Sequence, residues 1–209
     1  MSILILNLSV SSADNYPEQL VQLLGGREIK VVNDTEELAS SMASANEFDG
    51  LIVIGDYNDN PPLTDATTVT SGDSTVSFVV GLLQSTEWPV LAVGFGFELL
   101  CAASGIDLSQ FGDRGAGAEK IEPTTEGNKL FQGSDPLRVK PTERWLTDEF
   151  PKKLQVLARS DTGVEAVKHK TRLLYGLQQR PEDFVYPSDA NMVYRNIFSA
   201  FDQYNAKRP

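Results

Sequence analysis

The chain has 209 residues, of which 41% are hydrophobic and 22% are charged, and its formal net charge is −11 with a sequence pI near 4.5. This length suits one compact domain over residues 1–209, and no apolar run approaches the roughly 20 residues that span a bilayer, so a membrane protein is not expected. The acidic surface opposes nucleic acid as a partner, because like charges repel a phosphate backbone.

The N-terminus and the cysteine count indicate the compartment. The first ten residues, MSILILNLSV, have neither a basic leader nor a small-residue cleavage site, so they predict a buried strand and a cytoplasmic protein. The single cysteine, Cys101, excludes an internal disulfide and a thiolate metal cluster. No spacing of potential ligands points to a metal, and we expect no cofactor.

The first half of the chain alternates between short apolar runs and segments of helical period. Buried strands are predicted at residues 3–10, 28–33, 51–57 and 90–94, and helices at residues 14–24, 34–45 and 75–83. Asp34 is the expected cap of the second helix, with Glu37 completing a capping box. This alternation predicts an α/β fold with a mostly parallel sheet.

The second half has a different character. After Gly105, short β-prone pieces at residues 115–124, 136–145 and 154–160 are separated by glycine and proline, which predicts a small antiparallel β extension. Residues 164–181 then predict a hairpin. The last segment, residues 189–204, is expected to be a helix that docks on the sheet through a stripe of apolar side chains, namely Met192, Val193, Ile197, Phe198 and Phe201.

Four stretches carry a family resemblance. They are FDGLIVIGDYNDNPP (48–62), PVLAVGFGFELLCAASG (89–105), FPKKLQVLARSDTGVEAVKH (150–169) and YGLQQRPED (175–183). In this order and spacing they resemble the class I glutamine amidotransferase family, and within it the glutaminase domain or subunit of GMP synthase. The resemblance covers nearly the whole chain and implies a flavodoxin-like, mostly parallel sheet flanked by helices.

The resemblance also implies where a catalytic triad would stand. In the family a Cys thiolate on a strand-to-helix turn attacks glutamine, a His acts as its base and a Glu orients the His. The corresponding residues here are Gly94, Arg180 and Glu182. Glycine has no nucleophile, and a guanidinium with a pKa above about 12 cannot accept a proton near neutrality. Because loss of the nucleophile costs on the order of a millionfold in turnover, we expect negligible glutamine hydrolysis.

Other family positions have changed as well. Glu98 stands where the family has a Gln, and the loop after Ile54 carries Asp56, Tyr57 and Asn58 in place of small residues. Where the GMP synthase glutaminase has Ser-His-x-Asp, this chain has Thr142, Glu143, Arg144 and Trp145. Glutamine recognition is therefore expected to be compromised together with catalysis.

Cys101 and His169 are the candidate replacements for the missing Cys and His of the triad. Cys101 lies seven residues after Gly94, about two helical turns further, and we expect it to be a small buried apolar residue. His169, the only histidine, falls in the hairpin segment and not at the family's catalytic His, so we expect a surface or structural role.

These observations favour a catalytically inactive amidotransferase-like protein that acts as a binding or regulatory module, with a synthetase or another protein as its partner. An alternative is a repurposed enzyme or a small-anion binder in the altered pocket, where the Phe95 amide and Arg180 would face an anion. The alternative would draw on residues near this pocket, namely Asp56, Tyr57, Asp59, Glu98, Arg180 and Glu182. The competing hypothesis to a bound anion is an internal ion-pair cluster of Arg180 with Glu98 and Glu182. An active glutaminase that supplies ammonia for GMP synthesis is the least favoured hypothesis.

Overall fold

The computed structural model describes residues 2–9, 16–43, 47–55, 74–106, 112–113, 119–131, 137–140, 144–145, 151–161 and 163–207. Within them, nine strands form one sheet in the order β2-β1-β3-β4-β11-β10-β9-β6-β7. The first five strands in this order pair in parallel and the remaining pairs are antiparallel. The predicted α/β fold with an antiparallel β extension is therefore confirmed.

The elements follow the sequence expectations with small shifts at their ends. The strands are β1 (Ser2–Asn7), β2 (Glu28–Val32), β3 (Gly50–Gly55), β4 (Val90–Gly94), β5 (Gly112–Asp113), β6 (Glu119–Pro123), β7 (Leu137–Val139), β8 (Arg144–Trp145), β9 (Leu154–Ser160), β10 (Gly163–His169) and β11 (Leu174–Leu177). The helices are α1 (Tyr16–Leu23), α2 (Thr35–Ala43), α4 (Ser74–Ser85), α5 (Phe95–Ala103), the short 3-10 helix η2 (Pro181–Asp183) and α6 (Pro187–Asn205). Strands β5 and β8 form a separate two-stranded pair.

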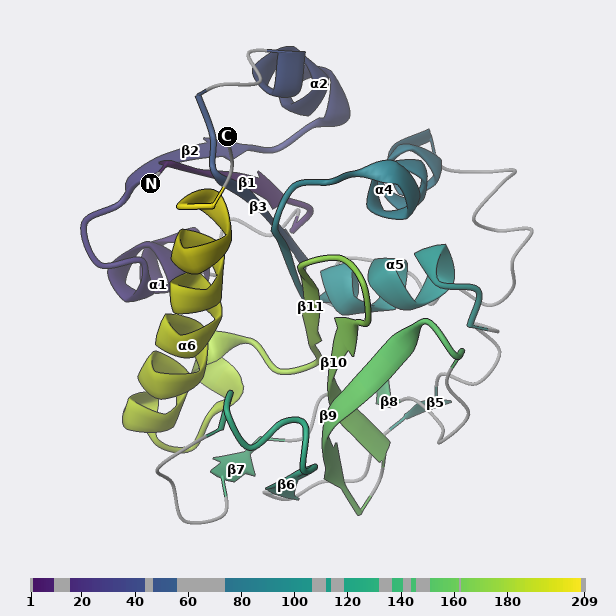
Figure 1. Ribbon diagram of the computed structural model, residues 1–209, viewed down its shortest axis with the longest axis vertical. Helices are drawn as coiled ribbons and strands as arrows, with labels where there is room; N and C mark the ends of the chain where they lie inside the picture. The colour runs from purple at the N-terminus through teal and green to yellow at the C-terminus, as the bar shows by residue number, and fades with distance from the viewer. Residues whose placement is uncertain are drawn as a thin grey trace.

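Helices cover both faces of the sheet (Figure 1). On one face, α2, α4 and α5 contribute Leu38, Val79 and Leu99 to a core with buried side chains from the strands. On the other face, α1 and α6 contribute Leu20 and Phe198 to a second core. Parallel strands that are covered on both faces have continuous apolar sequences. The apolar runs in the first half of the sequence therefore predicted these strands.

The C-terminal helix docks as its apolar stripe predicted. Val193, Ile197, Phe198 and Phe201 are fully buried on α6, and Met192 packs against the same core while partly exposed. The helix begins at Pro187 and ends at Asn205, one to two residues beyond the predicted ends. No helix among the described residues combines the length and the apolar character that a bilayer crossing requires.

The antiparallel extension fixes the turn that follows β11. The Lys140 N–H, just after β7, donates to the Asp183 carbonyl at 2.6 Å, and the Val185 N–H donates to the Arg138 carbonyl at 2.9 Å. These backbone bonds hold η2 from the side of the extension. Residues 180–185 are thereby positioned at the carboxyl edge of the parallel strands, where ligands bind in open α/β sheets.

Candidate functional site

The strand-to-helix turn at Gly94, called the elbow here, is present. β4 ends at Gly94, α5 begins at Phe95, and Gly94 has φ 59° and ψ −122°. A Cβ atom on Gly94 would lie 2.6 Å from the Gly55 carbonyl oxygen on the paired strand β3. The backbone thus has the strained form that presents a side chain at the apex of such a turn, and here no side chain is presented.

A second glycine allows the helix to start so close to the sheet. A Cβ atom on Gly96 would lie 2.2 Å from the Val53 carbonyl oxygen, a distance that no real Cβ contact tolerates. Phe95, whose amide begins α5, is 2% exposed. The two glycines of the segment therefore have structural roles in the close approach of helix and sheet.

Arg180 lies directly over the elbow. Its Cγ and Cδ atoms are 3.4 and 3.6 Å from the point that a Cβ on Gly94 would occupy. These are ordinary van der Waals distances, so the methylenes of Arg180 fill the space into which a nucleophile would project. The structure thus brings together two of the three residues that the sequence assigned to triad positions.

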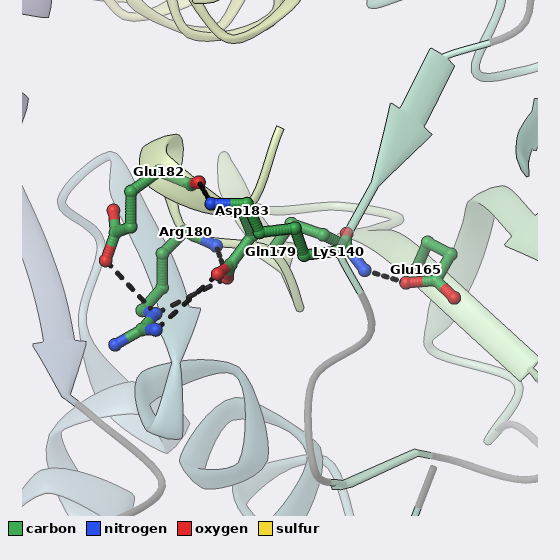
Figure 2. Close-up of polar contacts among 6 residues, drawn as sticks. All are labelled: Lys140, Glu165, Gln179, Arg180, Glu182 and Asp183. Atoms are coloured by element: carbon green, nitrogen blue, oxygen red, sulfur yellow. Dashed lines mark hydrogen bonds and ion pairs between the residues drawn. The ribbon is translucent and has the colours of Figure 1, made fainter. Parts of the chain in front are cut away.

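The guanidinium of Arg180 is held by two carboxylates of η2 (Figure 2). Its Nε lies 3.2 Å from Glu182 Oε1 and 3.4 Å from Asp183 Oδ2, and its Nη2 lies 3.5 Å from Asp183 Oδ1. The backbone N–H of Arg180 also donates to Asp183 Oδ2 at 2.8 Å. The Lys140 Nζ donates to the Glu182 carbonyl at 3.3 Å and its charge acts on Asp183, so two acids and two bases form an ion cluster with no net formal charge.

Burial shifts the acid–base properties of this cluster. The side chain of Asp183 is 9% exposed, and its burial raises the pKa of the carboxyl although the charge and hydrogen bonds of Arg180 oppose the shift. Beneath the cluster, Tyr194 of α6 is fully buried, and burial followed by the charges of Glu182 and Asp183 raises the pKa of its phenol. The Tyr194 hydroxyl has no hydrogen-bond partner among the described residues.

A buried polar pair supports the turn into Arg180. The fully buried Glu165 of β10 accepts a hydrogen bond from Ser160 Oγ at 2.5 Å. It accepts another from the Gln179 side-chain amide (Figure 2). Gln179 directly precedes Arg180, so the pair fixes the chain where it leaves β11. Neither Glu165 nor Asp183 was predicted as a site residue from the sequence. A charged residue inside the β-prone run VEAVKH was the signal that could have drawn attention to Glu165.

The remaining predicted site residues divide into two groups. Glu98 is 1% exposed in the first turn of α5, behind the elbow. Asp56, Tyr57, Asn58, Asp59, Thr142 and Glu143 lie outside the described residues, and the side chains of Arg144 and Trp145 are not described either.

Cys101 is fully buried on α5 within the core that α2, α4 and α5 cover. Burial, and secondarily the charge of Glu98, raises the pKa of its thiol well above the ordinary value. Since the thiolate is the nucleophile, a buried thiol with a raised pKa is unreactive. The predicted role of Cys101 as a buried apolar residue is confirmed.

His169 lies at the opposite end of the strands from the elbow. Tyr175 pairs with Leu91, three residues before Gly94, and Lys168 pairs with Tyr175, so His169 is more than about 10 Å from the elbow along the strands. Its Nδ1 accepts the backbone N–H groups of Thr171 and Arg172 at 3.3 and 3.2 Å. Burial, followed by the charges of Arg172 and Lys153, lowers its pKa. Of the surface or structural role that the sequence predicted for His169, its burial and its backbone hydrogen bonds favour the structural one.

No group of three or more His, Cys, Asp or Glu side chains in the described part of the chain is arranged to hold a metal ion.

Comparison with known proteins identifies relatives of the whole fold. The profile of the family described as glutamine amidotransferase class-I matches residues 8–200. One subunit of a glutamine-hydrolysing GMP synthase from Methanococcus maripaludis is 31% identical over 161 residues, which are 73% of this chain and 74% of the relative. The corresponding subunit of the Pyrococcus furiosus enzyme is 36% identical over 101 residues, which are 45% of this chain and 50% of the relative.

A solved structure extends the likeness to nearly the full length. A protein from Thermoplasma acidophilum, named for the same GMP synthase subunit, superposes with a TM-score of 0.73, at 19% identity, over 99% of this chain and 96% of that one. At this identity the superposition shows a shared fold and no more.

Proposed function

The chain belongs to the class I glutamine amidotransferase family, and from that premise we propose that it is a member without glutaminase activity that serves as a binding or regulatory module. One observation carries the proposal. At the elbow, where the family places its nucleophile, Gly94 keeps the required backbone conformation but presents no side chain, and the methylenes of Arg180 fill the vacant space.

The base of the reaction is missing for a separate reason. Arg180 stands at the position of the catalytic His, and a guanidinium cannot accept the proton of a nucleophile near neutral pH. The guanidinium is instead paired with Glu182 and Asp183. Glu182, at the third triad position, therefore binds a permanent cation instead of orienting an imidazole.

Neither Cys101 nor His169 supplies the lost chemistry. The thiol of Cys101 is buried and protonated. His169 lies at the opposite end of the strands from the elbow, and its Nδ1 accepts backbone N–H groups. An acyl-transfer mechanism needs a nucleophile within hydrogen-bond reach of a base. Neither residue meets that condition, which supports inactivity by the family mechanism.

The pairing of Arg180 also bears on the choice between an anion site and an ion-pair cluster. A guanidinium that binds a ligand anion must have hydrogen-bond donors to spare and a favourable local charge. Here its Nε and Nη2 face Glu182 and Asp183, and with Lys140 beside them the cluster carries no net formal charge. This supports the structural ion cluster over a bound anion at the elbow.

The partner we propose is a synthetase. The relatives are named as one subunit of a glutamine-hydrolysing GMP synthase, and such a name implies a second chain. A copy that keeps the fold but lacks the nucleophile and the base can retain the surface that such a partner contacts. The module would then regulate the partner's stability or its access to nitrogen without producing ammonia.

Reconstitution tests both halves of this proposal. The purified chain is mixed with a recombinant GMP synthetase subunit, and nucleotide product is measured with either glutamine or ammonium chloride as the nitrogen donor. We expect a complex on size-exclusion chromatography that forms product from ammonium and none from glutamine. Product from glutamine would contradict inactivity, and elution as two separate proteins would contradict the synthetase as partner.

A further inference from the structure

We propose that a groove between α6 and strands β9, β10 and β11 binds a small organic anion that carries a carboxylate or a phosphate. The groove has a volume of about 360 Å³, which is at the lower end of the range for small-molecule sites. It lies on the face of the sheet that α1 and α6 cover, and the turn after β6 closes one end.

The sheet side of the groove is a row of three residues on adjacent strands. Gln155 of β9 pairs directly with Lys168 of β10, and Lys168 pairs with Tyr175 of β11. Directly paired residues project their side chains from the same face of the sheet about 5 Å apart. The ammonium of Lys168 lies 5.2 Å from the centre of the Tyr175 ring, which is itself 7% exposed, so the ring holds the cation in place.

The helix side presents polar groups at matching positions. Asn196, Ser199 and Gln203 are spaced i, i+3 and i+7 on α6 and share one face of the helix. Asn196 Nδ2 donates to the Leu130 carbonyl at 2.7 Å, and Gln203 Nε2 donates to Ser199 Oγ at 3.3 Å. A helix packed on a sheet is normally joined to it by apolar side chains, so two facing polar rows indicate that the space between them holds a polar molecule.

The charge of the groove specifies the kind of molecule. Lys129, on the turn after β6, and Lys168 contribute two positive charges, and Glu126 contributes one negative charge. Among the described residues no carboxylate lies within ion-pair distance of either lysine. In a chain of net charge −11 this is a local positive excess. Two ammonium groups surrounded by amide and hydroxyl groups suit a small anion with further hydrogen-bonding atoms.

The groove is separate from the elbow. Tyr175 pairs with Leu91, three residues before Gly94, and its ring belongs to the core under α6, whereas α5 packs on the other face of the sheet. A ligand in the groove would therefore bind independently of the lost glutaminase site. Its binding would stabilise the packing of α6 against the antiparallel extension, which also positions η2.

An NMR titration of the ¹⁵N-labelled full chain tests the proposal. Inorganic phosphate and succinate are added in separate series at constant ionic strength. We expect saturable shifts of the amides of Lys129, Lys168, Tyr175 and Asn196 with at least one of the two anions. A response to phosphate alone or to succinate alone identifies which anionic group the site prefers.

Lysine variants show whether the shifts come from this groove. K168M and K129M should each weaken binding tenfold or more, because each removes a charged donor. Lys129 is exposed on a turn, so K129M keeps the test valid if K168M fails to fold. K120M is the matched control, since Lys120 lies outside the groove and pairs with Glu122 at 2.6 Å. Saturable shifts with neither anion, or equal weakening by K120M, would overturn the proposal.

Discussion

Arg180 covers Gly94: the Cγ and Cδ methylenes of the arginine lie 3.4 and 3.6 Å from the point where a Cβ on the glycine would stand. The two residues are 86 positions apart in the chain, yet they pack against each other at the end of β4. Without the arginine, the glycine would leave a void there, and a void costs packing energy. The methylenes of Arg180 therefore fill the space that Gly94 leaves at the elbow.

The first prediction concerns the elbow backbone. G94A places a Cβ at φ 59° and 2.6 Å from the Gly55 carbonyl oxygen, so we expect it to lower the free energy of unfolding by about 1–3 kcal/mol in chemical denaturation. G81A is the matched control, because Gly81 lies within α4 with open space around it. That variant should raise the stability by about 1 kcal/mol. Equal effects of the two variants would contradict a strained elbow.

The second prediction concerns the ion cluster. R180M keeps much of the side-chain volume over Gly94 but removes the guanidinium that pairs with Glu182 and Asp183. We expect a loss of about 2 kcal/mol at pH 7, measured by urea denaturation. In K120M, which breaks an exposed ion pair with Glu122, the loss should stay below about 1 kcal/mol. A stability of R180M equal to that of the unmodified chain would mean that the cluster contributes nothing.

The third prediction concerns pH. Because the pKa of Asp183 is raised in the folded chain, the folded state holds this proton to a higher pH than the unfolded state does. Its contribution to stability is therefore most favourable below the ordinary value of 3.8 and declines as the pH rises through the folded pKa. The difference in unfolding free energy between the unmodified chain and D183N should fall from about pH 4 to about pH 7. A difference that rises over this range would show that the shift has the opposite sign.

More of the fold than of the candidate site could be predicted from the sequence. Continuous apolar runs marked β1, β3 and β4 because parallel strands are buried on both faces, and the stripe on α6 marked its docking face. The pairing of β6 with β9 joins residues more than thirty positions apart, and nothing local in the sequence encodes such a contact. The sequence therefore predicted an antiparallel extension but not its role in holding η2.

At the site, the family resemblance predicted that positions 94 and 180 would meet, and the structure places them in contact. The resemblance did not predict that Asp183 would bind Arg180, because it assigns no role to that position. Nor did periodicity show that Glu165 and Gln179 would pair, since a buried polar partner is chosen by three-dimensional proximity. These contacts depend on side-chain directions that only the folded turn determines.

The fourth prediction concerns the buried phenol under the cluster. The Tyr194 hydroxyl is buried without a hydrogen-bond partner among the described residues, so Y194F removes an unsatisfied polar group at little cost in packing. We expect a rise in unfolding free energy of about 1 kcal/mol by thermal and chemical denaturation. Y204F, on the same helix, removes a hydroxyl that donates to the Glu87 carbonyl and should not stabilise the chain. A destabilised Y194F would indicate a partner for this hydroxyl.

Ammonia release from glutamine by the purified chain tests the loss of the nucleophile most directly. The rate should equal the buffer blank at every protein concentration, and C101S should behave identically, because Gly94 offers no attacking atom and Cys101 is buried. Ammonia release that rises in proportion to protein concentration would contradict the account. If C101S abolished that release, the nucleophile would be the thiol of α5 and not a residue at the elbow.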